Sequence, residues 1–110
     1  MKYPKEYLDE IKTRLKVSTV VSKTVNLKKR GKEFVGLSPF KTEKTPSFTV
    51  NDEKGFYHCF STAEHGNIFD FIMKTQNLKF GEAVKYLANL AGMQPYTFSK
   101  KDEEREKQWN

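Results

Sequence analysis

The sequence has a single cysteine, Cys59, and no long hydrophobic run, and each of these shortages excludes a class of protein. A lone cysteine cannot form a disulfide within the chain, which fits a reducing compartment. No apolar stretch approaches the roughly 20 residues that span a membrane. The first residues, MKYPKEYLDEIK, mix acids with bases and lack the apolar core of a secretory signal. We therefore expect a cytoplasmic protein that makes no contact with a membrane.

A chain of 110 residues has the length of one domain. Hydrophobic residues make up 36% of it and charged residues 31%, and part of this imbalance comes from the C-terminal end. After Pro95 the sequence reads YTFSKKDEEREKQWN, which offers few apolar side chains to a core. We therefore expect a folded domain over residues 1–94 and a charged linker over residues 95–110.

The net charge of +6 is concentrated in the N-terminal half of the chain. Residues 22–54 carry eight basic and four acidic side chains, whereas residues 55–95 carry three of each. The basic residues are densest at Lys28, Lys29, Arg30 and Lys32. A basic face on an otherwise neutral domain suits a polyanion such as nucleic acid. An ordinary solvated surface has the same composition, so charge alone does not choose between the two.

Apolar residues at helical spacing mark the two ends of the domain. Near the start, Pro4 precedes an apolar stripe and is tolerated in a first helical turn, so we predict a helix over residues 4–15. Ser18 is a candidate N-cap for a short helical turn after it. Near the other end, Asn67 is a candidate N-cap for a second helix, and a third is predicted from about residue 80 to residue 90. Gly92 is placed to end that last helix.

Between these helices the apolar pattern changes to a period of two, which is typical of strands. Four strands are predicted, at residues 25–28, 33–37, 47–50 and 56–60, with turns at Gly31 and at residues 51–55. The short turns favour an antiparallel meander. The predicted fold class is therefore α+β, with a small antiparallel sheet flanked by an N-terminal helix and two C-terminal helices.

Three segments occur together in a distinctive order: LKKRGKEF at residues 27–34, SPFKTEKTPSFTV at residues 38–50 and GFYHCFSTAEHGNIFDFI at residues 55–72. In order and spacing they resemble the N-terminal zinc-binding domain of bacterial DnaG-type primases, over about residues 4–91. The resemblance implies a zinc-ribbon type of sheet and a module that binds single-stranded template. It also implies that the module helps to choose the initiation site for RNA primers, beside a separate polymerase domain and near the replicative helicase.

The chain departs from this family at the metal site. The positions at which the family holds zinc are occupied here by Ser38, Lys41, Cys59 and Thr62. Hydroxyl groups are not normal zinc ligands, and a lysine ammonium repels a cation, so only Cys59 remains as a suitable donor. His58 cannot join it, because neighbours in a strand point to opposite faces. We therefore predict that no zinc is bound.

If zinc is absent, other contacts must link the two segments that carry the family's zinc ligands, around residues 38–41 and 59–62. We predict that Ser38 and Thr62 form hydrogen bonds across the old site, with Cys59 as a small buried apolar residue. Lys41 is predicted to pair with an acid such as Glu43 or Glu64.

Binding of a single strand needs cations along a backbone track and aromatic faces on which bases stack. We predict that Lys28, Lys29, Arg30 and Lys32 line such a track on the first hairpin. Lys44 and Ser47 are candidate phosphate or base contacts from the Pro-rich loop. Strand aromatics more often face the core, and this is our expectation for Phe48, Phe56 and Phe60. Phe48, Tyr57 and His58 complete the candidate DNA-binding set, the last two as those expected to be exposed.

No group of side chains predicts catalysis in this domain. Primer synthesis needs clustered carboxylates that hold magnesium, and no such cluster is visible, so we expect the metal only in a polymerase domain outside this chain. One alternative is a zinc-less interaction module that contacts the polymerase domain or the helicase without binding DNA. A free-standing ribbon that binds RNA or duplex, and a thiol enzyme built on Cys59, are two others.

Overall fold

A computed structural model describes residues 2–97, and over this range the predicted α+β fold is confirmed. The helices are α1 (Lys5–Arg14), α2 (Val17–Val21), α3 (Ile68–Gln76) and α4 (Phe80–Leu90). The strands are β1 (Lys28–Arg30), β2 (Glu33–Gly36), β3 (Phe48–Asn51), β4 (Phe56–Cys59) and β5 (His65–Gly66). No helix among these residues is both long and apolar enough to span a membrane. Residues 98–110, most of the predicted linker, lie outside the described range.

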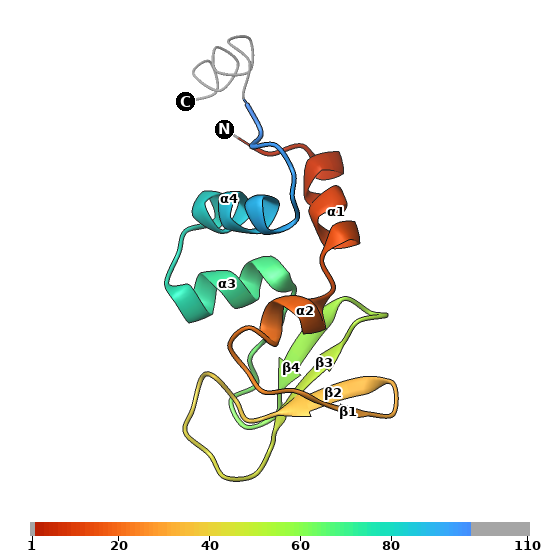
Figure 1. Cartoon of the computed structure of the whole chain (residues 1–110). Helices are drawn as coiled ribbons and strands as arrows, with labels where there is room; N and C mark the ends of the chain where they lie inside the picture. Colours follow the sequence, from red (N-terminus) through yellow and green to blue (C-terminus); the bar gives the residue numbers. More distant parts are fainter. Residues whose placement is uncertain (1, 98–110) are drawn as a thin grey trace.

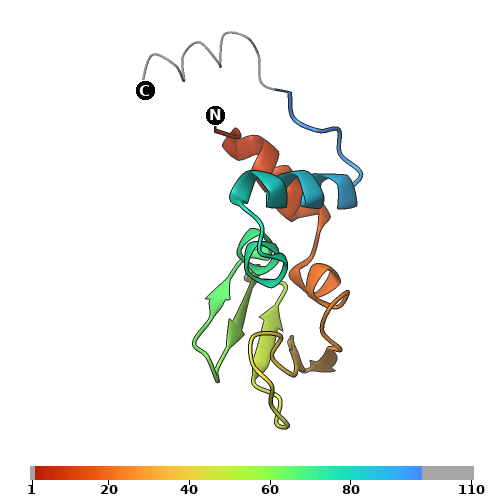
Figure 2. The same cartoon turned by 90° about the vertical axis from the view of Figure 1, so that its left-hand side faces the viewer.

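The five strands form one antiparallel sheet in the order of the sequence, β1-β2-β3-β4-β5. The helices lie at one end and to one side of this sheet, with α2 and α3 next to it and α1 and α4 beyond them (Figure 1). The view turned by 90° shows the strands below the helical layer (Figure 2). Of the helices, α2 and α3 pack against one face of the sheet, and we call the face turned away from them the outer face.

Strand alternation decides which side chains enter the core. Phe48 and Val50 of β3 and Tyr57 and Cys59 of β4 are fully buried on the inner face. The rings of Phe48 and Tyr57 stack with centroids 5.4 Å apart, and Phe71 of α3 meets the Tyr57 ring edge-on at 5.5 Å. Aromatic contacts of this kind add to the free energy of burying the rings, so this cluster holds α3 against the sheet.

Capping residues set where the helices begin. Asn67 caps α3 as predicted: its side chain accepts hydrogen bonds from the backbone of Phe69 and Asp70, and Asp70 accepts one from the backbone of Asn67. The predicted N-cap at Ser18 is wrong, because Ser18 lies inside α2. Its backbone N–H and hydroxyl instead donate to the carboxylate of Asp52, which reaches α2 from the β3–β4 turn.

Candidate nucleic-acid interface

The outer face of the sheet carries a row of side chains from every strand. The strand registers align Lys28 of β1 with Val35, Val35 with Thr49, Thr49 with His58, and His58 with His65. Residues opposite each other in neighbouring strands share a face of the sheet. Lysine, histidine and small side chains therefore lie side by side across the whole outer face.

Aromatic rings gather at the β3–β4 side of this face. Phe56 and Phe60, two residues before and after His58, have 43% and 69% of their surface exposed. The rings of Phe60 and His58 meet edge-on with centroids 4.4 Å apart, and the ring of His65 lies 6.2 Å from that of His58. Phe56, His58 and Phe60 also line a hollow of about 240 Å³ beside Thr49 and Asn51. These exposed rings offer stacking surfaces that folding does not use.

A polar atom lies among these rings. The Nδ1 atom of His58 is buried, and no hydrogen-bond partner for it occurs within residues 2–97. Buried polar atoms are nearly always hydrogen-bonded. Within residues 2–97 this nitrogen is therefore an exception to that rule.

The basic residues of the first hairpin border the same face. Lys28, Lys29, Arg30 and Lys32 are all exposed, and in the described part of the chain none of them forms an ion pair. Lys28 and Arg30 share the outer face by their register with Val35 and Glu33, and Lys29 alternates to the other side. Unpaired cations beside exposed rings are what a single-stranded polyanion requires.

Two of the predicted DNA contacts are not surface residues: Tyr57 was expected to be exposed and is buried, whereas the burial of Phe48 agrees with the expectation that it faces the core. Phe48 and Tyr57 have no exposed surface and pack against α3, so neither ring is available for stacking. Phe56 and Phe60, expected in the core, are the exposed rings. The position of Cys59 could have predicted this arrangement from the sequence. If the Cys59 side chain points to the covered face, strand alternation places Tyr57 on the same face and Phe56, His58 and Phe60 on the opposite one.

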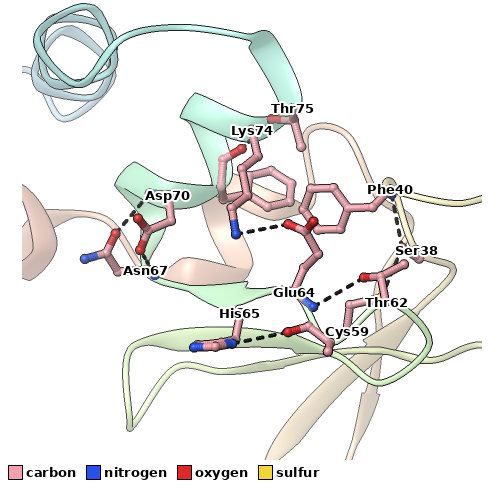
Figure 3. A network of polar contacts seen from close by, with 12 residues as sticks. Ser38, Phe40, Cys59, Thr62, Glu64, His65, Asn67, Asp70, Lys74 and Thr75 are labelled. Atoms are coloured by element: carbon pink, nitrogen blue, oxygen red, sulfur yellow. Dashed lines mark hydrogen bonds and ion pairs between the residues drawn. The ribbon is translucent and has the colours of Figure 1, made fainter.

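At the four positions that the resemblance assigns to zinc, the Cys59 thiol lies against serine hydroxyls. The Sγ atom of Cys59, which is fully buried, lies 3.2 Å from the hydroxyl oxygen of Ser38 and 3.3 Å from that of Ser61. The hydroxyl of Thr62 accepts a hydrogen bond from the backbone N–H of Glu64 (Figure 3). Lys41 is exposed. Serine hydroxyls that surround a thiol do not suit zinc, and no cluster of three or more His, Cys, Asp or Glu occurs within residues 2–97.

Glu43 accepts the hydrogen bonds that hold together the two ends of the loop at residues 38–47. One carboxylate oxygen accepts the backbone N–H groups of Ser38 at 2.9 Å and Ser47 at 3.1 Å, and the other accepts the Ser47 hydroxyl at 2.7 Å. The Oγ atoms of Ser47 and Ser61 are 2.8 Å apart, and this contact extends the network to the segment at residues 59–62. The Ser47 hydroxyl and, to a lesser degree, the Ser38 N–H hold the pKa of Glu43 below its ordinary value.

The predicted ion pair of Lys41 is wrong on this geometry. Glu43 is occupied by Ser38 and Ser47, and Glu64 pairs with Lys74 of α3 at 3.0 Å (Figure 3). Neither carboxylate is joined to Lys41 within the described range. The hydrogen bond to Glu64 is the main reason that the pKa of Lys74 is raised. The pair links the β4–β5 turn to α3.

Cys59 is more than a small apolar residue. Burial acts to raise the pKa of its thiol, but hydrogen bonds from the hydroxyls of Ser38, Ser61 and Thr62 and from the backbone of Thr62 outweigh burial and lower the pKa to about 6. Because the sulfur has no exposed surface, this acidity does not make it accessible to a substrate.

Comparisons with known proteins agree with the sequence pattern. A family model described as CHC2 zinc finger matches residues 3–104. The chain is 43% identical over 94 residues to a DNA primase of Haemophilus influenzae, and 43% identical over 91 residues to one of Escherichia coli. These alignments cover 84% and 83% of this chain but 16% of each relative.

A solved structure has the same fold. The crystal structure of the Aquifex aeolicus primase, with its zinc-binding and RNA polymerase domains, superposes with a TM-score of 0.76 at 27% identity. The match covers 88% of this chain and 25% of the Aquifex chain. The chain thus spans about a sixth of the curated relatives that it matches.

Proposed function

Because this chain belongs to the CHC2 zinc-finger family, whose relatives here are bacterial DNA primases, we propose that it is the template-binding module of a primase. In this role it binds single-stranded DNA on the outer face of its sheet and takes part in choosing where an RNA primer begins. The rest of the primase supplies the polymerase domain, with its magnesium, and the contacts with the replicative helicase. The module works in the cytoplasm and performs no chemistry of its own.

The observation that carries this proposal is the exposure of Phe56 and Phe60, with the half-buried His58 between them, on the same sheet face as Lys28 and Arg30. Stacking on aromatic rings is tolerant of sequence, and cations along the path neutralise phosphates. Three strand spacings separate β4 from β1, or about 14 Å. A short stretch of extended single strand crosses that distance and meets both kinds of group.

The Pro-rich loop contributes less directly than the sequence suggests. Lys44 is exposed and free to contact a phosphate. The Ser47 hydroxyl is committed to Glu43 and Ser61, so its role is to hold the loop. The DNA-binding set we propose on the outer face is therefore Lys28, Arg30, Lys32, Lys44, Phe56, His58 and Phe60; Lys29, which alternates to the other side of β1, is left out.

We further propose that the fold does not depend on zinc. Glu43 joins both ends of the loop at residues 38–47, and Ser38, Ser47 and Ser61 link that loop to Cys59. These hydrogen bonds connect the two segments that a structural zinc would cross-link. The residues present therefore replace the metal with a carboxylate and hydroxyl network.

The test is an NMR titration of the ¹⁵N-labelled chain with single-stranded DNA of about ten nucleotides, within the usual range of site sizes. Amides of residues 28–32 and 56–60 should shift, and raising the salt concentration should reverse the shifts because counterions are released on binding. A folded spectrum in which no residue responds to DNA at low salt would contradict the proposal. In that case the interaction module is the better reading, and addition of a separate polymerase domain or helicase should shift the same surface with little dependence on salt.

A further inference from the structure

A second hollow lies at the edge of the sheet, beyond the aromatic rings. It encloses about 620 Å³ between the segment that enters β1 and the loop that follows β2. Two ammonium groups, from Lys28 and Lys44, line it, and its walls include the apolar side chains of Val35, Leu37 and Pro46. Leu37 leaves 47% of its surface exposed. A volume of this size is within the range of sites that bind small molecules.

This hollow continues the outer face. Lys28 and Val35 belong to the cross-strand row that contains His58. Leu37 comes two residues after Val35, so strand alternation carries it to the same face. A strand that crosses the rings toward β1 therefore arrives at the hollow.

The chemistry of the walls selects one class of ligand. A phosphate alone needs the two lysines but not the apolar wall, and an apolar ligand needs the wall but not the lysines. A nucleotide has a flat base that packs on apolar side chains and a phosphate that attracts ammonium groups. Only the combination uses both parts of the hollow.

Glu43 holds one side of the hollow in place. Its carboxylate binds the backbone of Ser38 and of Ser47, which are the two ends of the loop that carries Lys44 and Pro46. Ser38 itself lines the hollow. A wall that is fixed before binding costs less ordering entropy when a ligand arrives. Glu43 is thus a positioning residue for this site.

We propose that this hollow binds a single nucleotide of the template strand, its base packed on Leu37 and Pro46 and its phosphate between Lys28 and Lys44. The inference rests on the proposed function, because it assumes that the bound strand runs over the outer face. It adds one nucleotide-binding site at the β1–β2 end of the path.

The experiment titrates the labelled chain with deoxynucleoside 5′-monophosphates carrying each base in turn, with inorganic phosphate and with oligothymidylate. Mononucleotides should shift the amides of residues 25–28, 35–38 and 44–46, and phosphate should shift them much less. Leu37→Ser should weaken mononucleotide binding about fivefold. Lys44→Gln should weaken it about tenfold, and Lys85→Gln, the same change of charge on exposed α4, should have no effect.

Three results overturn the proposal in distinguishable ways. Equal responses to phosphate and to mononucleotides would show an anion site without base contact. Oligothymidylate that shifts residues 56–60, while mononucleotides at millimolar concentration leave the hollow unchanged, would keep the proposed function and remove the nucleotide site. No response to either ligand by the folded chain would remove both. As a further readout, Glu43→Gln should weaken mononucleotide binding while the shifts of residues 56–60 with oligothymidylate persist.

Discussion

The sharpest test of the outer face is the replacement of Phe60 by alanine. Phe60 has 69% of its surface exposed, so the fold loses little when the ring is removed. Surface substitutions of this kind change the free energy of unfolding by about 0.5 kcal/mol or less. If a base stacks on the ring, the loss in binding free energy is about 1–3 kcal/mol. This corresponds to a dissociation constant about 5- to 150-fold higher.

The inner face should respond in the opposite way. Phe48 has no exposed surface and stacks on Tyr57. Phe48→Ala should lower the free energy of unfolding by about 3–5 kcal/mol, as is typical of large core truncations. That is a large part of the roughly 5–15 kcal/mol by which a domain is stable. The two phenylalanines are thus expected to separate binding from stability.

Fluorescence anisotropy of labelled single-stranded DNA at low salt measures the affinity, and circular dichroism measures the thermal midpoint. Tyr86→Ala, which removes a ring 36% exposed on α4, is the matched control and should bind as the parent does. Phe60→Trp should keep or strengthen binding, because it preserves a stacking surface. Parental affinity for Phe60→Ala, with an unchanged thermal midpoint, would refute the assignment of the outer face to DNA.

Three further predictions concern the fold. Dialysis against a strong chelator should leave the thermal midpoint and the NMR spectrum unchanged, because Glu43 and the serines replace the metal; loss of the spectrum would show that zinc is bound. The pKa of Cys59 is lowered from 9.0 to about 6 in the folded chain, so its contribution is complete above pH 9 and disappears as pH falls through 6. Stability should therefore rise from pH 6 to 9, and Cys59→Ala should flatten that rise; an identical slope in the variant would argue against the acidic thiol. Gly66→Ala should destabilise by about 1 kcal/mol or more, because a Cβ there would lie 2.5 Å from the Asp70 carboxylate that caps α3. Gly81→Ala, where a Cβ meets nothing, is the control for thermal melting and should lose no stability.

Much of the structure could be predicted from interactions between residues that are close in the sequence. The period of the apolar residues located the helices and the three central strands, because amphipathic elements bury one side. The first strand was predicted at residues 25–28 but lies at Lys28–Arg30, and the two-residue β5 was not predicted. Asn67 and Asp70 form the helix cap that their spacing indicates. This cap could be predicted because its hydrogen bonds join residues that are at most three positions apart in the sequence. The motif order at residues 27–72 identified the family, which the comparisons confirm.

The hydrogen-bond and ion-pair partners of polar side chains were harder to predict than the helices and strands. Glu43 was expected to meet Lys41, yet it binds Ser38 and Ser47, because a carboxylate satisfies buried backbone donors before it pairs with an exposed ammonium. Likewise, Asp52 caps α2 from 34 residues away. Contacts of this kind depend on how the chain folds back on itself.

By itself, the sequence determined the class of fold, the family and the departure of Ser38, Lys41 and Thr62 from good zinc ligands, since each follows from residue identity and spacing. Only the tertiary structure decided which face of β4 is covered. Alternation divides Tyr57 from Phe56 and His58 but assigns neither side to solvent. The packing of α2 and α3 makes that choice, and it leaves the rings of Phe56 and Phe60 outside, where a strand of DNA can reach them.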